Sequence, residues 1–183
     1  MLKLEASILA QKIGGSLVGT ATRIVMGDGN LDAKIMFVGE APGKKEDETG
    51  IPFVGASGKL LNLLLESIAL DRNSVYITNI VKYRPPNNRD PSKTEKREFL
   101  PFLQQQIEII NPKVICPLGR HPASVLLPTK VEISKIHGSC ITVEKRKIVP
   151  LYHPAAAMYD PRLRSTLFDD FQRLKQYLAE IDI

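Results

Sequence analysis

The chain has 183 residues, of which 43% are hydrophobic and 25% are charged, so it is long enough for one well-buried core and short for two. No stretch approaches the roughly 18 apolar residues of a membrane span, and the amino terminus lacks the apolar core of a signal peptide, so we expect a cytoplasmic protein with no membrane partner. The net charge of +5 favours a polyanionic partner.

Short apolar runs alternate with amphipathic segments along the chain, which is typical of one α/β domain over residues 1–183. The expected elements are a helix near Leu4 and Ile8, a strand over 35–38, a helix over 57–68, a strand over 75–78, a helix over 92–110, strands over 114–118 and 148–152, and a helix over 167–181. Each gap between strands contains a candidate crossover, which parallel strands require.

The third of these helices has clear boundary signals. Ser92 and Glu95 have the spacing of a capping box, and Pro112 ends the apolar pattern as the steric rule for pre-proline residues predicts. No internal repeat or linker interrupts the order of elements.

Polar residues follow three of the four expected strands. The first strand is followed by Glu40, the second by Asn79 and the fourth by His153, whereas the third breaks at Gly119. In an open parallel sheet, ligands bind beyond the carboxyl ends of the strands. We therefore expect a carboxylate, an amide and an imidazole to converge on one crevice.

The loop after the first strand, Gly39–Gly43, has glycines at both ends, so its backbone can bend sharply and approach a ligand closely. A tight turn with a solvated glutamate would also explain this pentapeptide. Phe53 is either a core residue or a stacking platform. The segment 55–59 opens a helix whose free N–H groups could receive a phosphate, but it lacks the Walker A pattern of P-loop enzymes.

The loops after the second and fourth strands suit nucleic acid. Residues 79–89 are basic, rich in amides and stiffened by proline. Asn79 could cap a turn, or it could present both its C=O and its NH₂ to a base edge. Small residues after His153 permit close approach of a bulky ligand, and Arg162 and Arg164 suit backbone phosphates.

Four motifs in this order resemble the uracil-DNA glycosylase superfamily, in its family-four branch, from about residue 23 to residue 174. They are Gly39-Glu40-Ala41-Pro42-Gly43, Glu46-Asp47-x-x-Gly50-x-Pro52-Phe53-Val54-Gly55, Thr78-Asn79-x-x-Lys82-x-Arg84-Pro85-Pro86 and His153-Pro154-Ala155-Ala156. The glutamate after Gly39 separates this branch from the family-five enzymes. A related branch forms a covalent adduct through a histidine after the third motif, and residues 87–96 contain no histidine here.

The resemblance implies a three-layer α/β/α fold with a central four-stranded parallel sheet, and hydrolysis of the bond between uracil and deoxyribose. Glu40 would position or activate water, and His153 would stabilise the charge that develops at uracil O2, where a preorganised donor favours the transition state. Phe53 would stack on uracil and Asn79 would bond its Watson–Crick edge, with Gly39, Ala41 and Pro42 beside the base.

The implied partner is uracil-containing DNA, single- or double-stranded, bound by a monomer that would be associated with the nucleoid in a prokaryote. The target base must leave the helical stack, and Met158 or Tyr159 is the expected wedge in the gap. The residues expected to contact DNA are Ser57, Lys82, Arg84, Met158, Tyr159, Arg162 and Arg164.

One departure from the family concerns its iron–sulfur cluster, which four cysteines hold in family-four enzymes. The corresponding positions here are Ile13, Ser16, Tyr83 and Phe99, and the two cysteines of the chain, Cys116 and Cys140, lie elsewhere. Because such clusters need thiolate ligands, we predict that this protein has no cluster, and we expect no other metal or cofactor.

Two other functions fit parts of the pattern. A DNA-binding accessory or damage-sensing protein could keep the fold and lose the chemistry, but it would need none of Glu40, Phe53, Asn79 and His153 in combination. A small-molecule nucleosidase could use the same crevice, but the basic loops disfavour it.

Overall fold

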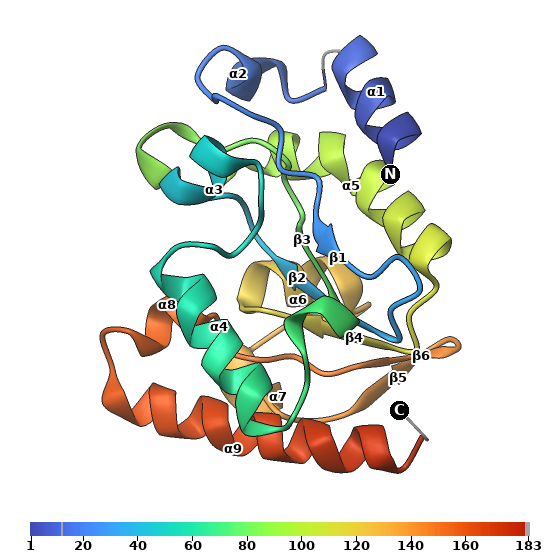
Figure 1. Cartoon of the computed structure of the whole chain (residues 1–183), viewed down its shortest axis with the longest axis vertical. Helices are drawn as coiled ribbons and strands as arrows, with labels where there is room; N and C mark the ends of the chain where they lie inside the picture. Colours follow the sequence, from blue (N-terminus) through green and yellow to red (C-terminus); the bar gives the residue numbers. More distant parts are fainter. Residues whose placement is uncertain (12, 182–183) are drawn as a thin grey trace.

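The computed structural model describes residues 1–11 and 13–181, which form a sheet between two layers of helices (Figure 1). This confirms the expected α/β fold. The strands are β1 (Asp28–Gly29), β2 (Ile35–Gly39), β3 (Tyr76–Asn79), β4 (Val114–Pro117), β5 (Ile141–Val143) and β6 (Arg146–Ile148). The helices are α1 (Leu2–Ala10), α2 (Gly15–Val18), α3 (Lys44–Thr49), α4 (Ala56–Ser67), α5 (Lys93–Ile110), α6 (Arg120–Leu126), α7 (Ile133–Ile136), α8 (Pro154–Ala157) and α9 (Pro161–Ala179), with 3₁₀ turns η1 (Arg72–Ser74) and η2 (Pro86–Asn88).

The sheet is larger than the expected four strands and is mixed. Its order is β1-β3-β2-β4-β6-β5, in which β3, β2, β4 and β6 pair in parallel and the two edge strands pair antiparallel. Neither edge strand could be predicted, because β1 has two residues and β5 has three, too few to establish a period of two.

The fourth expected strand lies earlier in the chain than predicted. The strand covers Arg146–Ile148 rather than 148–152, since Pro150 has no N–H to donate to the ladder. The chain nevertheless stays extended beside β4, because the Leu151 amide donates to the Pro117 carbonyl at 2.9 Å. This extension carries the backbone to His153 at the edge of the sheet.

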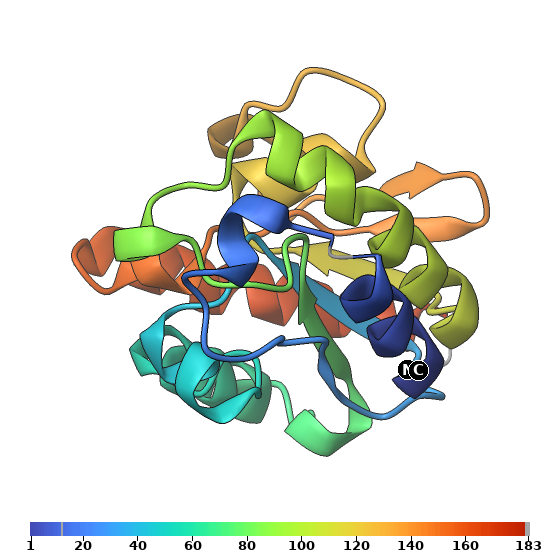
Figure 2. The same cartoon turned by 90° about the horizontal axis from the view of Figure 1, so that it is seen from above.

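Alternating side chains of the strands face the two helical layers. On β2, Met36 and Val38 pack with α1 and α5, whereas Ile35 and Phe37 pack with α4 and α9. Figure 2 shows α2 and α1 lying beside α5, on the same layer. Each face of the sheet is therefore buried, as a parallel sheet requires.

The helix boundaries follow local signals. The capping box of α5 is present, with the Ser92 side chain accepting from the Glu95 amide, and the helix ends at Asn111 in the left-handed conformation before Pro112. Helix α4 begins at Ala56 with Gly55 as its N-cap, so Ser57 does not open it as expected. Within residues 1–11 and 13–181, no helix has both the length and the apolar character to cross a membrane.

Candidate active site

A cavity of about 520 Å³ opens beyond the carboxyl ends of β2 and β3. Glu40, Asn79 and His153 all line it, although they are far apart in sequence. The predicted residues that line it are Glu40, Ala41, Pro42, Phe53, Ser57, Asn79, His153, Met158 and Tyr159. The parallel strands therefore bring together the three chemical groups that the strand ends predicted.

Phe53 lies in the cavity wall with a strained backbone. Its φ of 52° is in the left-handed region, which costs a non-glycine residue about 1–2 kcal/mol. The buried Glu46 carboxylate holds the following loop, because its Oε1 accepts from the amides of Val54 at 2.9 Å and Gly55 at 2.8 Å. Gly58 leaves space for the Phe53 carbonyl, since a Cβ there would lie 1.8 Å from that oxygen. The surroundings thus fix the ring at the site.

Asn79 ends β3 with only 2% of its surface exposed. Its Oδ1 is buried and has no hydrogen-bond partner among the described residues. A buried amide oxygen left unpaired costs about 1–3 kcal/mol, so a ligand that donates to it would be favoured. Gly39 keeps this slot open, because a Cβ there would lie 2.3 Å from Oδ1 and 2.7 Å from the Phe53 ring.

His153 faces the same space as a neutral donor. Its Nδ1 accepts from the Ala155 amide at 3.1 Å, which caps α8. The proton of the neutral imidazole is therefore on Nε2. Burial lowers the pKa of His153 to about 4, so the ring is uncharged at neutral pH. The rings of His153 and Phe53 have centroids 5.7 Å apart.

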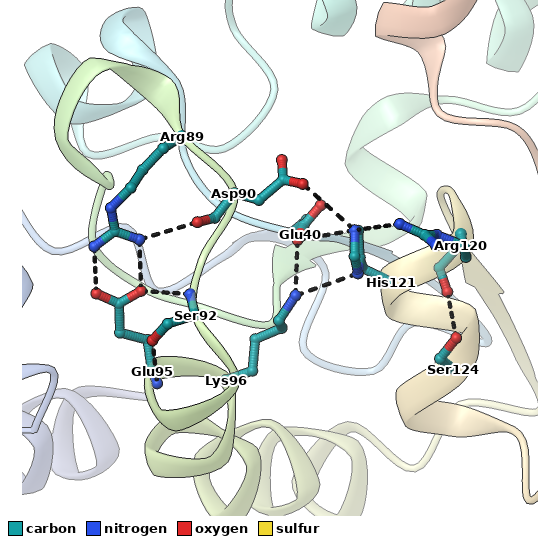
Figure 3. Close-up of polar contacts among 9 residues, drawn as sticks. All are labelled: Glu40, Arg89, Asp90, Ser92, Glu95, Lys96, Arg120, His121 and Ser124. Carbon is teal, nitrogen blue, oxygen red and sulfur yellow. Dashed lines mark hydrogen bonds and ion pairs between the residues drawn. The ribbon is translucent and has the colours of Figure 1, made fainter.

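Glu40, immediately after β2, is held by a polar cluster (Figure 3). Its Oε1 lies 3.1 Å from Lys96 Nζ and 3.8 Å from His121 Nε2, and Asp90 Oδ2 lies 3.6 Å from the same imidazole nitrogen. Glu40, Asp90 and His121 could offer three metal ligands within 4.8 Å of one another. The Lys96 ammonium already neutralises Glu40 at contact distance and would repel a divalent cation, so this arrangement does not suit a metal.

The structure corrects the expectation that Lys82 contacts DNA. Its side chain is fully buried, and Nζ donates to Thr78 Oγ1, the Asn79 carbonyl and Gln106 Oε1. Burial lowers the pKa of Lys82 to about 7. Lys82 therefore supports the end of β3 from inside and cannot reach a phosphate.

The other residues expected to contact DNA lie at or beyond the cavity rim. Tyr159 is 88% exposed and Met158 is 43% exposed, and both line the mouth of the cavity. Arg84, Arg162 and Arg164 are not among the lining residues. Arg162 pairs with Asp160, the N-cap of α9. The roles of these residues in DNA binding remain predictions.

Three residues that shape the site were not predicted from the sequence: Lys96, His121 and Glu46. His121 is the second residue of α6, which begins shortly after β4 with Gly119 as its N-cap. The expectation that polar residues after strand ends line the site, which predicted Asn79, could therefore have predicted His121 as well. Lys96 comes from the side of a crossover helix, and no local pattern marks it. Glu46 belongs to the second of the four motifs, but its hydrogen bonds to the loop after Phe53 depend on tertiary contact.

The positions of the family's cluster cysteines are packed together. The rings of Tyr83 and Phe99 meet edge to face at 6.0 Å, and a Cβ on Gly14 would lie 2.7 Å from the Phe99 ring. Ser16 donates to Glu95 Oε1 at 2.8 Å, and Ile13 packs against the same core. Two aromatic rings, an aliphatic side chain and a hydroxyl already bonded to a carboxylate do not fit an iron–sulfur cluster.

Comparisons with known proteins reveal related sequences. Residues 26–179 match the family model described as the uracil DNA glycosylase superfamily. Three of the most similar relatives are each named type-4 uracil-DNA glycosylase. The protein from Sulfurisphaera tokodaii is 48% identical over 85% of this chain and 74% of its own. The one from Saccharolobus solfataricus is 48% identical over 85% and 76%, and the one from Archaeoglobus fulgidus is 47% identical over 85% and 82%.

Proposed function

Because the chain belongs to the uracil DNA glycosylase superfamily, we propose that it hydrolyses the bond between uracil and deoxyribose in DNA and leaves an abasic site. The observation that carries this proposal is the shared cavity of Glu40, Phe53, Asn79 and His153. A DNA-binding accessory protein would need no such combination, and none of the similarities described above favours that alternative.

Base recognition rests on the unpaired amide of Asn79. Its Oδ1, buried without a partner among the described residues, would accept from uracil N3–H, and its NH₂ would donate to O4. Cytosine presents an acceptor at N3 and a donor at the neighbouring exocyclic group, so both contacts would oppose like groups. Phe53 would stack on the base that Asn79 reads.

Departure of the base depends on His153. As the C1′–N1 bond breaks, its electron pair passes into uracil and negative charge collects at O2. The Nε2–H of a neutral imidazole, fixed by the bond from the Ala155 amide to Nδ1, would donate to that oxygen. A donor aimed at charge that develops in the transition state lowers the barrier more than it strengthens substrate binding.

Glu40 would act on the other side of the breaking bond. The sugar becomes cationic at C1′ as uracil leaves, and a carboxylate beside it stabilises that charge. Water then forms the new C1′–O bond and releases a proton, which Glu40 can direct to solvent, while the uracil anion takes up a proton after release. The products are free uracil and an abasic deoxyribose.

DNA would reach the cavity with its target nucleotide turned out of the stack, at a cost of a few kcal/mol. Exposed Met158 and Tyr159 at the rim suit the wedge, and Ser57, Arg84, Arg162 and Arg164 would contact the backbone. We further propose that the chain acts as one domain and as a monomer, which light scattering of the purified protein at working concentration would test.

We also propose that this protein works without the family's cluster. The chain has two cysteines, and Cys116 is buried within β4. The side chains at the four usual ligand positions occupy the space in which a cluster would lie. The contact between Tyr83 and Phe99 would hold the loop after β3 against α5. The hydrogen bonds from the Gly14 amide to Glu98 and from Ser16 to Glu95 would hold the amino-terminal segment there, where metal–sulfur bonds do so in the family.

An end-labelled oligonucleotide with one uracil tests the proposed activity. After incubation and alkali treatment, we expect cleavage only at the uracil position, in single strands and in pairs with guanine or adenine. The matched oligonucleotide with cytosine should stay intact. Retention of the labelled DNA without any cleavage would instead identify a binding protein.

A further inference from the structure

We propose that Lys96 is a positioning residue for Glu40, and that His121 connects it to the neighbouring carboxylate of Asp90. This inference rests on the proposed function, because it assigns Lys96 to the same reaction. Its basis is the cluster in Figure 3, in which groups from α5, from the loop before α5 and from α6 surround the Glu40 side chain.

Lys96 is presented to Glu40 by a fixed helix start. Its amide donates to the Ser92 carbonyl at 3.0 Å, and the preceding residue, Glu95, is bound by the capping box and by a bidentate pair with Arg89. These bonds lower the pKa of Glu95 to about 2, chiefly through Arg89. Because the first turn of α5 is held in this way, the Lys96 side chain starts from a defined point.

The contact between Lys96 and Glu40 is largely removed from water. Only 16% of the Lys96 side chain and 19% of the Glu40 side chain are exposed, and the two atoms are 3.1 Å apart. A pair at this depth is screened less than a surface pair, so loss of one partner leaves the other charge uncompensated. Lys96 is therefore not a solvated surface lysine.

His121 orients the ammonium of Lys96. Lys96 Nζ carries only donors, so His121 Nδ1, at 3.2 Å, must be the acceptor. The proton of the neutral imidazole is then on Nε2, which faces Glu40 at 3.8 Å and Asp90 at 3.6 Å. In this tautomer, the guanidinium of Arg120, 3.3 Å from Nε2, is a neighbour and not a hydrogen-bond donor to it.

Among the residues that the structure describes, the two side chains that pair with the Glu40 carboxylate approach the same oxygen. Lys96 and His121 each approach Oε1, which leaves Oε2 for the attacking water or the sugar. When one oxygen of a carboxylate is held by hydrogen bonds, the position of the other oxygen is fixed as well. Without Lys96, the carboxylate can turn about its last bond, and misplacement of a reacting group by about 1 Å can cost on the order of 100-fold in rate.

The contact also joins α5 to the β2 loop, so a purely structural role must be separated from positioning. A double-mutant cycle does this with single-turnover rates on a one-uracil oligonucleotide at saturating full-length protein. The variants are K96M, K96R, E40Q and E40Q/K96M. K93M is the matched control, because Lys93 is an exposed lysine in the same helical turn and its loss changes net charge equally.

We expect K96M to lower the rate by roughly 10- to 100-fold, K96R to lose less, and K93M to stay within about twofold of the wild type. In the E40Q background, K96M should cause no further loss beyond about twofold, because Lys96 acts through Glu40. A structural role would instead lower the melting temperature and slow both backgrounds alike.

The outcomes separate the two proposals. If the wild type releases no uracil, both the proposed function and this inference are wrong. If the wild type is active and K96M is equally fast, or slows E40Q as much as it slows the wild type, only the inference is overturned. If K96M does not fold, H121F is measured in the same double-mutant cycle with E40Q, because H121F removes the acceptor of Lys96 and keeps its ammonium. An unchanged rate of H121F would also overturn the inference.

Discussion

Replacing His153 separates its contact with helix α8 from its proposed contact with the base. In H153A both are lost, whereas asparagine in H153N can still cap α8 by accepting from the Ala155 amide, but it is too short to reach the base. If Nε2 behaves as an oxyanion-hole donor, each variant should lower the chemical step by about 10²- to 10³-fold, or about 2.7–4 kcal/mol. Only H153A should also lose cap stability, by about 0.5–2 kcal/mol.

The pH dependence of the rate and of the stability follows from the lowered pKa of His153. Since the pKa of His153 falls from 6.5 to about 4 on burial, the imidazole stays neutral across the working range. The ratio of the wild-type rate to the H153N rate should therefore be constant between about pH 5 and pH 8. Between about pH 6.5 and 4 the unfolded chain binds a proton that the folded chain does not, so the free energy of unfolding falls as the pH falls, by up to about 1.4 kcal/mol per unit.

Single-turnover excision and urea unfolding measure the two effects separately. If H153N excises uracil at the wild-type rate, His153 takes no part in the chemical step. A step in the rate ratio near pH 6.5 would mean that the imidazole is not neutral across this range.

The remaining predictions concern base recognition, stability and iron content. N79D should excise uracil more slowly and shift base choice toward cytosine, measured with paired uracil and cytosine oligonucleotides, and an unchanged N79A would reduce Asn79 to a structural cap. F99A should lower the free energy of unfolding by about 3–5 kcal/mol, because it removes a buried aromatic ring. The wild-type protein should be colourless, iron-free by elemental analysis and insensitive to chelators. Stoichiometric iron would contradict this. K82M should cost about 1–3 kcal/mol, because it removes the Lys82 donor from the buried Asn79 carbonyl and from the Gln106 oxygen. In the wild type, burial lowers the pKa of Lys82 from 10.5 to about 7. As the pH rises from about 7 to about 10.5, the free energy of unfolding should therefore increase, since only the unfolded chain then carries the proton. Urea titrations at each pH should show this increase in the wild type and not in K82M.

The site could be predicted from sequence wherever backbone topology decides position. Strands over 35–38 and 75–78 fixed the neighbourhood of Glu40 and Asn79, because parallel strands end at one edge of the sheet. His153 joined them although β6 ends earlier than expected, since the extended chain continues beside β4 after Pro150.

What could not be predicted depends on tertiary contacts between side chains. Lys82 lies in a basic loop, and only the folded chain reveals the three acceptors that draw its ammonium inward. Glu46 and Lys96 lie on helices, and the apolar pattern of a helix predicts which face is buried but not which partner a polar side chain contacts. The edge strand β1 forms by pairing with β3, which lies far away in sequence. Strand β5 pairs with its sequence neighbour β6, but three residues are too few to establish a period of two.

Release of free uracil is the measurement that tests the central claim most directly. Uracil-containing DNA is incubated with the wild-type protein, and free uracil and abasic sites are counted by mass spectrometry in the same sample. We predict one uracil for each abasic site, intact strands before alkali, and no base released from the matched cytosine DNA. Binding to uracil-containing DNA with no free uracil would contradict the account.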